Sequence, residues 1–185
     1  AMMRKRTRER LSDFGEGPDG KIEYQGATCR YVSDVPLPKV RVRLWAQVCL
    51  GLVAAVAPGF MPVAGLVGTI VTVVAYVAQL VAMVTVVWAL ARLTAVKASE
   101  PVRVYVREET ADAIPRRALV AAGIALLVAL SEVSTLIMGL PLSPFELAFL
   151  ACEAICMVCL VQVRKSCELM SWQEEPGKLA KGNKK

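Results

Sequence analysis

Residues 118–163 have the sequence ALVAAGIALLVALSEVSTLIMGLPLSPFELAFLACEAICMVCLVQV. Between Arg117 and Arg164 the only charged residues are three glutamates, with no lysine, arginine or histidine among them. A turn containing Gly and Pro separates two apolar runs, 118–138 and 144–163. Each run has roughly the 17–25 residues needed to cross ~30 Å of hydrocarbon. The stretch therefore predicts a transmembrane helical hairpin that carries carboxyl groups inside the membrane.

A second pair of apolar runs precedes this stretch, at residues 44–61 and 63–93. The later run is longer than a span requires: at ~1.5 Å per residue it would cover about 45 Å, so we expect it to tilt or to protrude from the membrane. Hydrophobic residues make up 56% of the chain, more than a soluble core of this size uses. The fold expected is an all-α membrane protein, a bundle of four transmembrane helices in two tandem hairpins.

The basic residues indicate how the hairpins are oriented. All 22 lysines and arginines fall in residues 4–43, 92–117 and 164–185, and the two short turns contain none. The positive-inside rule then predicts that both termini and the central loop are cytoplasmic. We expect an integral protein of a bacterial inner (plasma) membrane. Its predicted segments are a basic N-terminal segment, a first hairpin, a cytoplasmic loop, a second hairpin and a basic tail, at residues 1–43, 44–93, 94–117, 118–163 and 164–185.

A small β element is predicted in the cytoplasmic segments. Residues 21–24 and 28–32 flank Gln25-Gly26-Ala27, which is typical of a short hairpin. Residues 102–107 alternate apolar with basic side chains, the pattern of a half-buried strand. Three strands make a sheet more credible than an isolated hairpin.

Three of the predicted spans carry polar residues along one face. Spacings of three and four residues place side chains on one side of a helix, and small residues on such a face let a neighbouring helix approach closely. The three faces are Ala118, Ala122, Ala125, Ala129 and Glu132; Glu146, Phe149, Glu153, Cys156 and Leu160; and Thr69, Thr72, Tyr76, Gln79 and Met83. Counted from the outer turns, Glu132 and Glu153 lie at similar depths, roughly 9 and 14 Å.

The functional hypothesis is a proton- or cation-binding site at Glu132 and Glu153. Two neighbouring carboxyl groups in a low dielectric do not both ionise without a cation. The residues expected to line the path are Thr69, Thr72, Tyr76, Gln79 and Glu146. The protein would then be a small transporter or channel-like protein.

Other interpretations of the glutamates stay open. Each carboxyl group can be protonated and hydrogen-bonded between helices. Glu146 is more simply a helix-start residue, with Ser143 as the N-cap and Glu146 completing a capping box. Alternatively, the chain is a non-catalytic membrane subunit or scaffold whose intramembrane glutamates and cytoplasmic sheet pair with a partner protein.

The remaining motifs are weaker. Cys152, Cys156 and Cys159 share a broad helix face and could hold a soft metal, although a buried thiol resists deprotonation. The chain has no histidine, which disfavours an enzyme, and we expect no cofactor. The basic arm at residues 4–10 is expected to meet anionic lipid headgroups rather than nucleic acid. We also expect either a homo-oligomer or a partner membrane protein.

Overall fold

The computed structural model describes residues 14–16, 22–63, 66, 69–139 and 143–176. This part of the chain is mostly helical. Each of four long helices is long and apolar enough to cross a membrane. They are α2 (Leu37–Val56), α4 (Ile70–Thr94), α6 (Ala113–Ile137) and α7 (Pro144–Cys167). Two shorter helices are the 3-10 helix η1 (Ala57–Phe60) and α5 (Val104–Glu109). The arrangement is compatible with an integral membrane protein.

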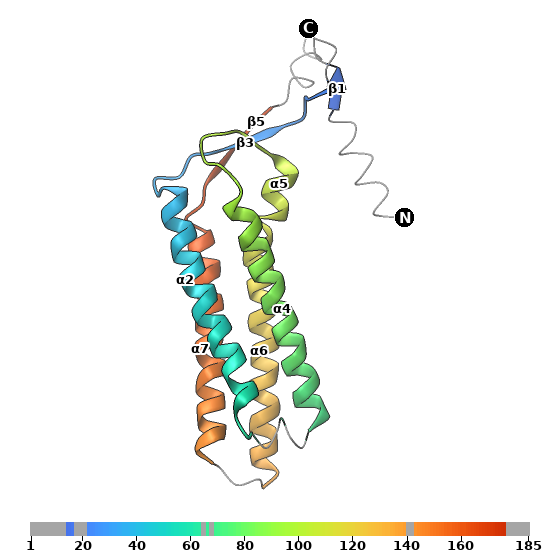
Figure 1. Ribbon diagram of the computed structural model, residues 1–185, viewed down its shortest axis with the longest axis vertical. Helices are drawn as coiled ribbons and strands as arrows, with labels where there is room; N and C mark the ends of the chain where they lie inside the picture. Colours follow the sequence, from blue (N-terminus) through green and yellow to red (C-terminus); the bar gives the residue numbers. More distant parts are fainter. Residues whose placement is uncertain (1–13, 17–21, 64–65, 67–68, 140–142, 177–185) are drawn as a thin grey trace.

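The four long helices form a closed bundle (Figure 1). Helix α4 packs on α6, α6 on α7, α7 on α2, and α2 on α4. Helices α4 and α7 therefore lie diagonally across the bundle. Each helix runs antiparallel to the one before it, so that α2 and α6 begin at the end where α4 and α7 finish.

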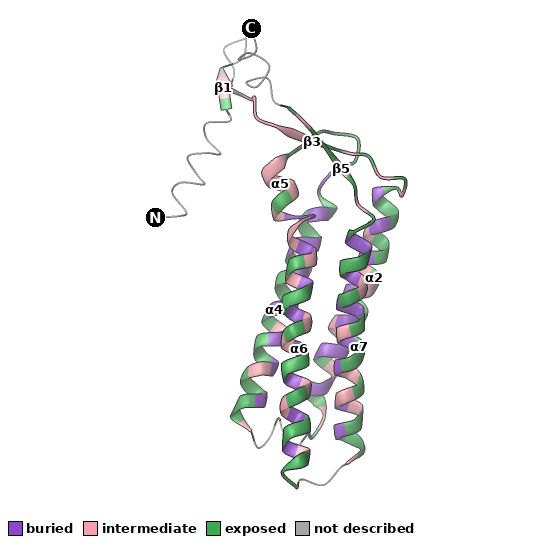
Figure 2. Ribbon diagram, turned by 180° about the vertical axis from the view of Figure 1, so that it is seen from behind, coloured by how far each residue is buried: buried purple, intermediate pink, exposed green. Residues whose placement is uncertain are grey.

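The core follows from small and aliphatic residues that recur at helical spacing. Figure 2 shows buried residues as stripes along the helices, with exposed residues on the outer faces. The largest fully buried aliphatic side chains are Leu37, Leu44, Met83, Leu90, Leu93, Ile114 and Leu160. The outer faces carry exposed valines and leucines, including Val71, Val81, Val84, Leu127 and Val158. An apolar exterior of this extent suits hydrocarbon better than water.

The helix boundaries correct the expected second span. Helix α4 begins at Ile70, not at residue 63, and its 25 residues cover about 37 Å. Helix α4 is therefore only slightly longer than the hydrocarbon thickness and does not need a large tilt or a long protruding end. Among the described residues between η1 and α4, Met61–Val63 belong to no helix or strand. Hydropathy alone does not separate this apolar connection from the helix, because its residues are as apolar as those of α4.

Strands and α5 lie at the end of the bundle where α7 finishes, and we call this group the cap (Figure 1). Strand β1 (Phe14–Glu16) and strand β2 (Ile22–Tyr24) form an antiparallel pair. A separate antiparallel sheet has the order β4-β3-β5. Its strands are β4 (Val102–Arg103), β3 (Thr28–Tyr31) and β5 (Trp172–Glu175).

The expected β element is confirmed, and strands from residues 28–32 and 102–107 pair in one sheet, but the expected hairpin of residues 21–24 with 28–32 is wrong. Strand β2 pairs with β1 rather than with β3. The predicted strand at 102–107 ends after Arg103, and α5 begins at Val104. The third strand of the larger sheet is β5, from the C-terminal segment, which no alternation pattern indicated. Residues 172–175 form a strand because they pair with β3, where Arg30 and Tyr31 lie opposite Gln173 and Trp172.

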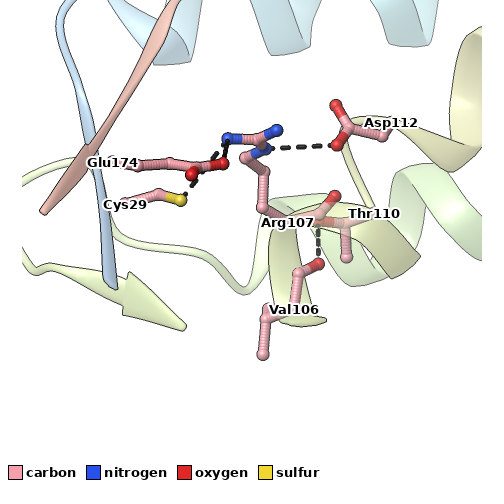
Figure 3. Close-up of polar contacts among 6 residues, drawn as sticks. All are labelled: Cys29, Val106, Arg107, Thr110, Asp112 and Glu174. Atoms are coloured by element: carbon pink, nitrogen blue, oxygen red, sulfur yellow. Dashed lines mark hydrogen bonds and ion pairs between the residues drawn. The ribbon is translucent and has the colours of Figure 1, made fainter. Parts of the chain in front are cut away.

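One guanidinium joins the cap to the bundle (Figure 3). Arg107 lies on α5, and its Nε is 3.1 Å from Oδ2 of Asp112, the N-cap residue of α6. Its Nη1 lies 3.0 Å from Oε1 of Glu174 on β5 and donates at 3.5 Å to Sγ of Cys29 on β3. Burial raises the pKa of the Cys29 thiol, and Arg107 opposes this effect. Arg107 thus links two strands to the start of α6.

Candidate functional site

A hydrogen bond crosses the interior of the bundle between two diagonal helices. Nε2 of Gln79 on α4 donates to Oε2 of Glu153 on α7 at 2.7 Å. Both side chains are fully buried. The same nitrogen lies 3.7 Å from Sγ of Cys156, one turn further along α7. The amide, the carboxyl group and the thiol form a polar centre inside an otherwise apolar bundle.

The face of α7 that carries Glu153 is the one predicted from spacing. Its five residues, Glu146, Phe149, Glu153, Cys156 and Leu160, are all buried. The register is set where the helix starts. Ser143 caps α7, and its Oγ accepts a hydrogen bond from the backbone N–H of Phe145 at 3.2 Å. Glu153 lies on the buried face of this helix.

Three oxygen atoms inside the bundle lack a hydrogen-bond partner among the described residues. They are Oε1 of Glu153, Oε1 of Gln79 and Oγ1 of Thr72. Within the described part of the chain, no lysine or arginine forms an ion pair with Glu153. An unsatisfied buried polar group costs about 1–3 kcal/mol, and more when it is charged. A proton or a small cation bound to Glu153 would reduce this cost.

Glu132 lies on α6, which packs against both α4 and α7. It is fully buried, as are Ala118 and Ala125 from its predicted face. Ala122 and Ala129 are only half-buried, and Ala121 and Val128 are buried in their place. The buried stripe is therefore turned slightly from the one expected. The Glu153 carboxyl group accepts a hydrogen bond from Gln79 on α4.

The other predicted path residues are distributed along α4. Thr69 is the half-buried N-cap position of the helix, while Thr72 and Tyr76 are buried within it. The hydroxyl of Tyr76 donates to the backbone oxygens of Ala55 and Val56, at 2.8 and 3.3 Å. These are carbonyls at the end of α2. Tyr76 therefore ties α4 to α2, a structural contact that sequence reasoning did not identify.

Glu146 sits in the first turn of α7 and completes the capping box with Ser143. Its Oε2 accepts hydrogen bonds from the backbone N–H of Ser143, at 3.2 Å, and from the Ser143 hydroxyl. The prediction of a helix-start role is confirmed. A path-lining role for Glu146 stays a prediction.

The cysteines of α7 pack into the bundle. Cys156 and Cys159 are buried and Cys152 is half-buried. Among the described residues, no three Cys, Asp, Glu or His side chains come close enough to hold a metal ion. Cys159 instead faces Gly51 on α2, where a Cβ added to the glycine would lie 3.2 Å from Cβ of Cys159. This close approach gives Cys159 a packing role.

Gln79 is the residue whose importance the sequence understated. It was expected to line a path, whereas it is the direct hydrogen-bond partner of Glu153. A single amide in a helix as apolar as α4 was the available signal, since such a group needs a buried partner. Comparisons with protein-family models, with curated proteins and with solved structures find no match for this chain, so its site is interpreted from its own residues.

Proposed function

We propose that this protein is a small membrane transporter or channel-like protein that binds a proton or a cation at Glu153. The observation that carries the proposal is the Gln79–Glu153 pair, fully buried and placed across the diagonal of the bundle. Oε1 of Glu153 has no hydrogen-bond partner among the described residues. Ionisable residues inside a membrane are expensive, and they commonly mark ion pathways and proton relays.

The chemistry of the site favours reversible occupancy. Gln79 stabilises one carboxyl oxygen of Glu153 and leaves the other to take a proton or to ligate a cation. Because the amide is neutral, it holds the carboxyl group in place without neutralising its charge. Glu132, buried on the neighbouring helix α6, supplies a second carboxyl group through which a proton or cation would pass.

Flux through liposomes tests this function. The purified protein is reconstituted with a pH-sensitive dye inside, and proton or cation flux is started by an imposed gradient. Glu153→Gln keeps the shape of the side chain and removes its ability to ionise, so we expect the flux to fall to the level of empty liposomes. Glu108→Gln is the matched control, because this carboxylate is exposed on α5, outside the bundle. Equal flux in wild type and Glu153→Gln would refute the proposal.

A second candidate function is a non-catalytic membrane subunit that docks a partner through the cap. The observation that favours it is the open edge of β3. Strand β4 pairs only with Thr28 and Cys29, so among the described residues Arg30 and Tyr31 have no strand beside them on that side. Such an edge can accept a strand from another protein. Purification in mild detergent separates the two functions: a second protein in stoichiometric amount supports the subunit, and an active chain purified alone supports the transporter.

A further inference from the structure

A cavity of about 420 Å³ opens between the end of α4, the connection to β4, and α5. Its size lies within the range of roughly 300–1,000 Å³ that is usual for small-molecule sites. It lies at the cap end of the bundle and shares no residue with the Gln79–Glu153 centre. Basic and apolar side chains from these three segments line it, together with one carboxylate.

The charged groups of this cavity are unbalanced. Arg92, Lys97 and Arg103 line it, against one lining carboxylate, Glu100. Lys97 pairs with Glu100 at 2.9 Å, and Arg92 pairs with Glu109 at 3.0 Å. The Lys97 and Glu100 side chains are 71% and 63% exposed. Exposed ion pairs contribute little free energy, so Lys97 can turn to a more strongly charged ligand at small cost. The Arg92 and Glu109 side chains are less exposed, at 45% and 31%.

Arg103 is the cation that the cap holds in position. Its guanidinium lies over the rings of Phe14 and Tyr24, with Cζ 5.3 and 4.9 Å from the ring centroids. Its Nη1 also donates to the hydroxyl of Tyr105 at 2.9 Å. These contacts fix a planar group whose remaining N–H donors match the geometry of a phosphate.

The cavity also lies at the right level for a membrane surface. Arg92 is in the last turn of α4, one of the four helices apolar enough to cross a membrane. The apolar lining residues Val96, Val102 and Val106 suit the glycerol and first methylenes of a lipid. Basic pockets at helix ends are known to hold anionic headgroups. We propose that this cavity binds a phosphate ester, presented by the headgroup of an anionic lipid.

The test measures lipid bound to the detergent-solubilised full chain. The probes are phosphatidylglycerol, the zwitterionic phosphatidylcholine and the soluble ester glycerol 3-phosphate. Arg92→Gln with Lys97→Gln removes two lining charges. Arg116→Gln with Lys165→Gln is the matched control, since both residues are exposed basic residues at the same end of the bundle and outside the cavity. Glu100→Gln, which removes the lining carboxylate, is a variant that should gain affinity.

We expect the wild type to prefer phosphatidylglycerol to phosphatidylcholine. At about fivefold per charge, the cavity pair should lower that affinity roughly twenty-fivefold. Glu100→Gln should raise it about fivefold, while the control pair should change it by less than about threefold. The gain in Glu100→Gln is not explained by misfolding. An equal loss in both pairs, or no preference for the anionic lipid, would overturn the proposal. Binding of glycerol 3-phosphate without phosphatidylglycerol would overturn the lipid source.

Discussion

The amide of Gln79 and the carboxyl group of Glu153 meet at 2.7 Å across the diagonal of a four-helix bundle. Their helices, α4 and α7, are not neighbours in the ring, so this hydrogen bond spans its interior. Polar partners that meet in this way are energetically coupled, because removing one leaves the other buried and unsatisfied. The pair therefore fixes the relative rotation of two helices as well as forming the proposed binding centre.

The first prediction concerns this coupling. Gln79→Leu should lower the free energy of unfolding by about 1–3 kcal/mol, since it leaves Glu153 buried without its donor. The double variant Gln79→Leu with Glu153→Leu should recover much of that loss, because neither polar group then remains. Chemical denaturation in detergent, followed by circular dichroism, measures both. Gln162→Leu on α7, a half-buried amide, is the control. A double variant less stable than Gln79→Leu would contradict the coupling.

The second prediction separates the two glutamates of α7. Ser143→Ala removes the N-cap side chain and should cost about 1 kcal/mol of stability. Glu146→Gln should have little effect on either stability or flux, because glutamine also completes a capping box. Glu153→Gln should abolish flux while the protein stays folded. The liposome assay, run beside thermal unfolding, compares the three variants. A loss of flux in Glu146→Gln would instead support a path-lining role for Glu146.

The buried face of α7 could be predicted from the sequence because it depends only on the helical spacing of three and four residues. Helical spacing, a Ser-Pro start and a glutamate three residues after the serine all agree, and all five predicted residues are buried. The start of α4 could not be predicted in this way. Residues 63–69 are as apolar as the helix that follows, so hydropathy does not mark where helical hydrogen bonding begins.

The cap was the least predictable part, since tertiary pairing outweighs local preference there. Residues 104–107 alternate like a strand, yet they belong to α5, which carries Arg107 towards Asp112 and Glu174. Strand β5 has the sequence WQEE, without alternation, and forms because β3 lies beside it. In the candidate site, the charge of Glu153 and its place on the predicted face of α7 identify it from the sequence. Gln79 is its partner because α4 and α7 lie diagonally across the bundle. The spacing of residues within one helix does not indicate which helices will be diagonal.

The third prediction tests the contact between α2 and α7. Gly51→Ala places a Cβ 3.2 Å from Cβ of Cys159, so the helices must separate slightly. This strain should offset the gain of about 1 kcal/mol that alanine brings over glycine in a helix interior. Combining it with Cys159→Gly should cost less than the sum of the two single changes, since the crowded atom is then gone. Gly123→Ala on α6 is the control, because its Cβ meets nothing within 4 Å. Thermal unfolding of the four variants gives the comparison, and strict additivity would exclude the contact.

The fourth prediction concerns Arg107, whose side chain is 20% exposed and forms ion pairs with Asp112 and Glu174. Arg107→Gln should destabilise the cap by about 1–3 kcal/mol. Arg107→Lys should rescue it only in part, since one ammonium lacks the planar fork that contacts several groups. The control, Arg30→Gln, breaks a pair whose side chains are 61% and 46% exposed, and should cost less than about 0.5 kcal/mol. Urea unfolding of the cap is followed by the fluorescence of Trp172, with Trp45 and Trp88 replaced by phenylalanine. Equal losses of stability in Arg107→Gln and Arg30→Gln would show that Arg107 does not stabilise the cap more than an exposed ion pair does.

The fifth prediction is the pH dependence of the same cap. Burial raises the pKa of the Cys29 thiol above its ordinary value of 9.0, so the folded cap keeps its proton at a pH where the unfolded chain releases it. The contribution of Cys29 to stability is therefore complete below about pH 9 and is lost as the pH rises further. The Cys29→Ser variant has no titrating group at this position. Cap stability should therefore decline less steeply in the variant than in the wild type between about pH 8.5 and 10.5, the window around the thiol pKa. Parallel pH profiles, measured by Trp172 fluorescence, would show instead that the buried thiol ionises with equal ease in both states.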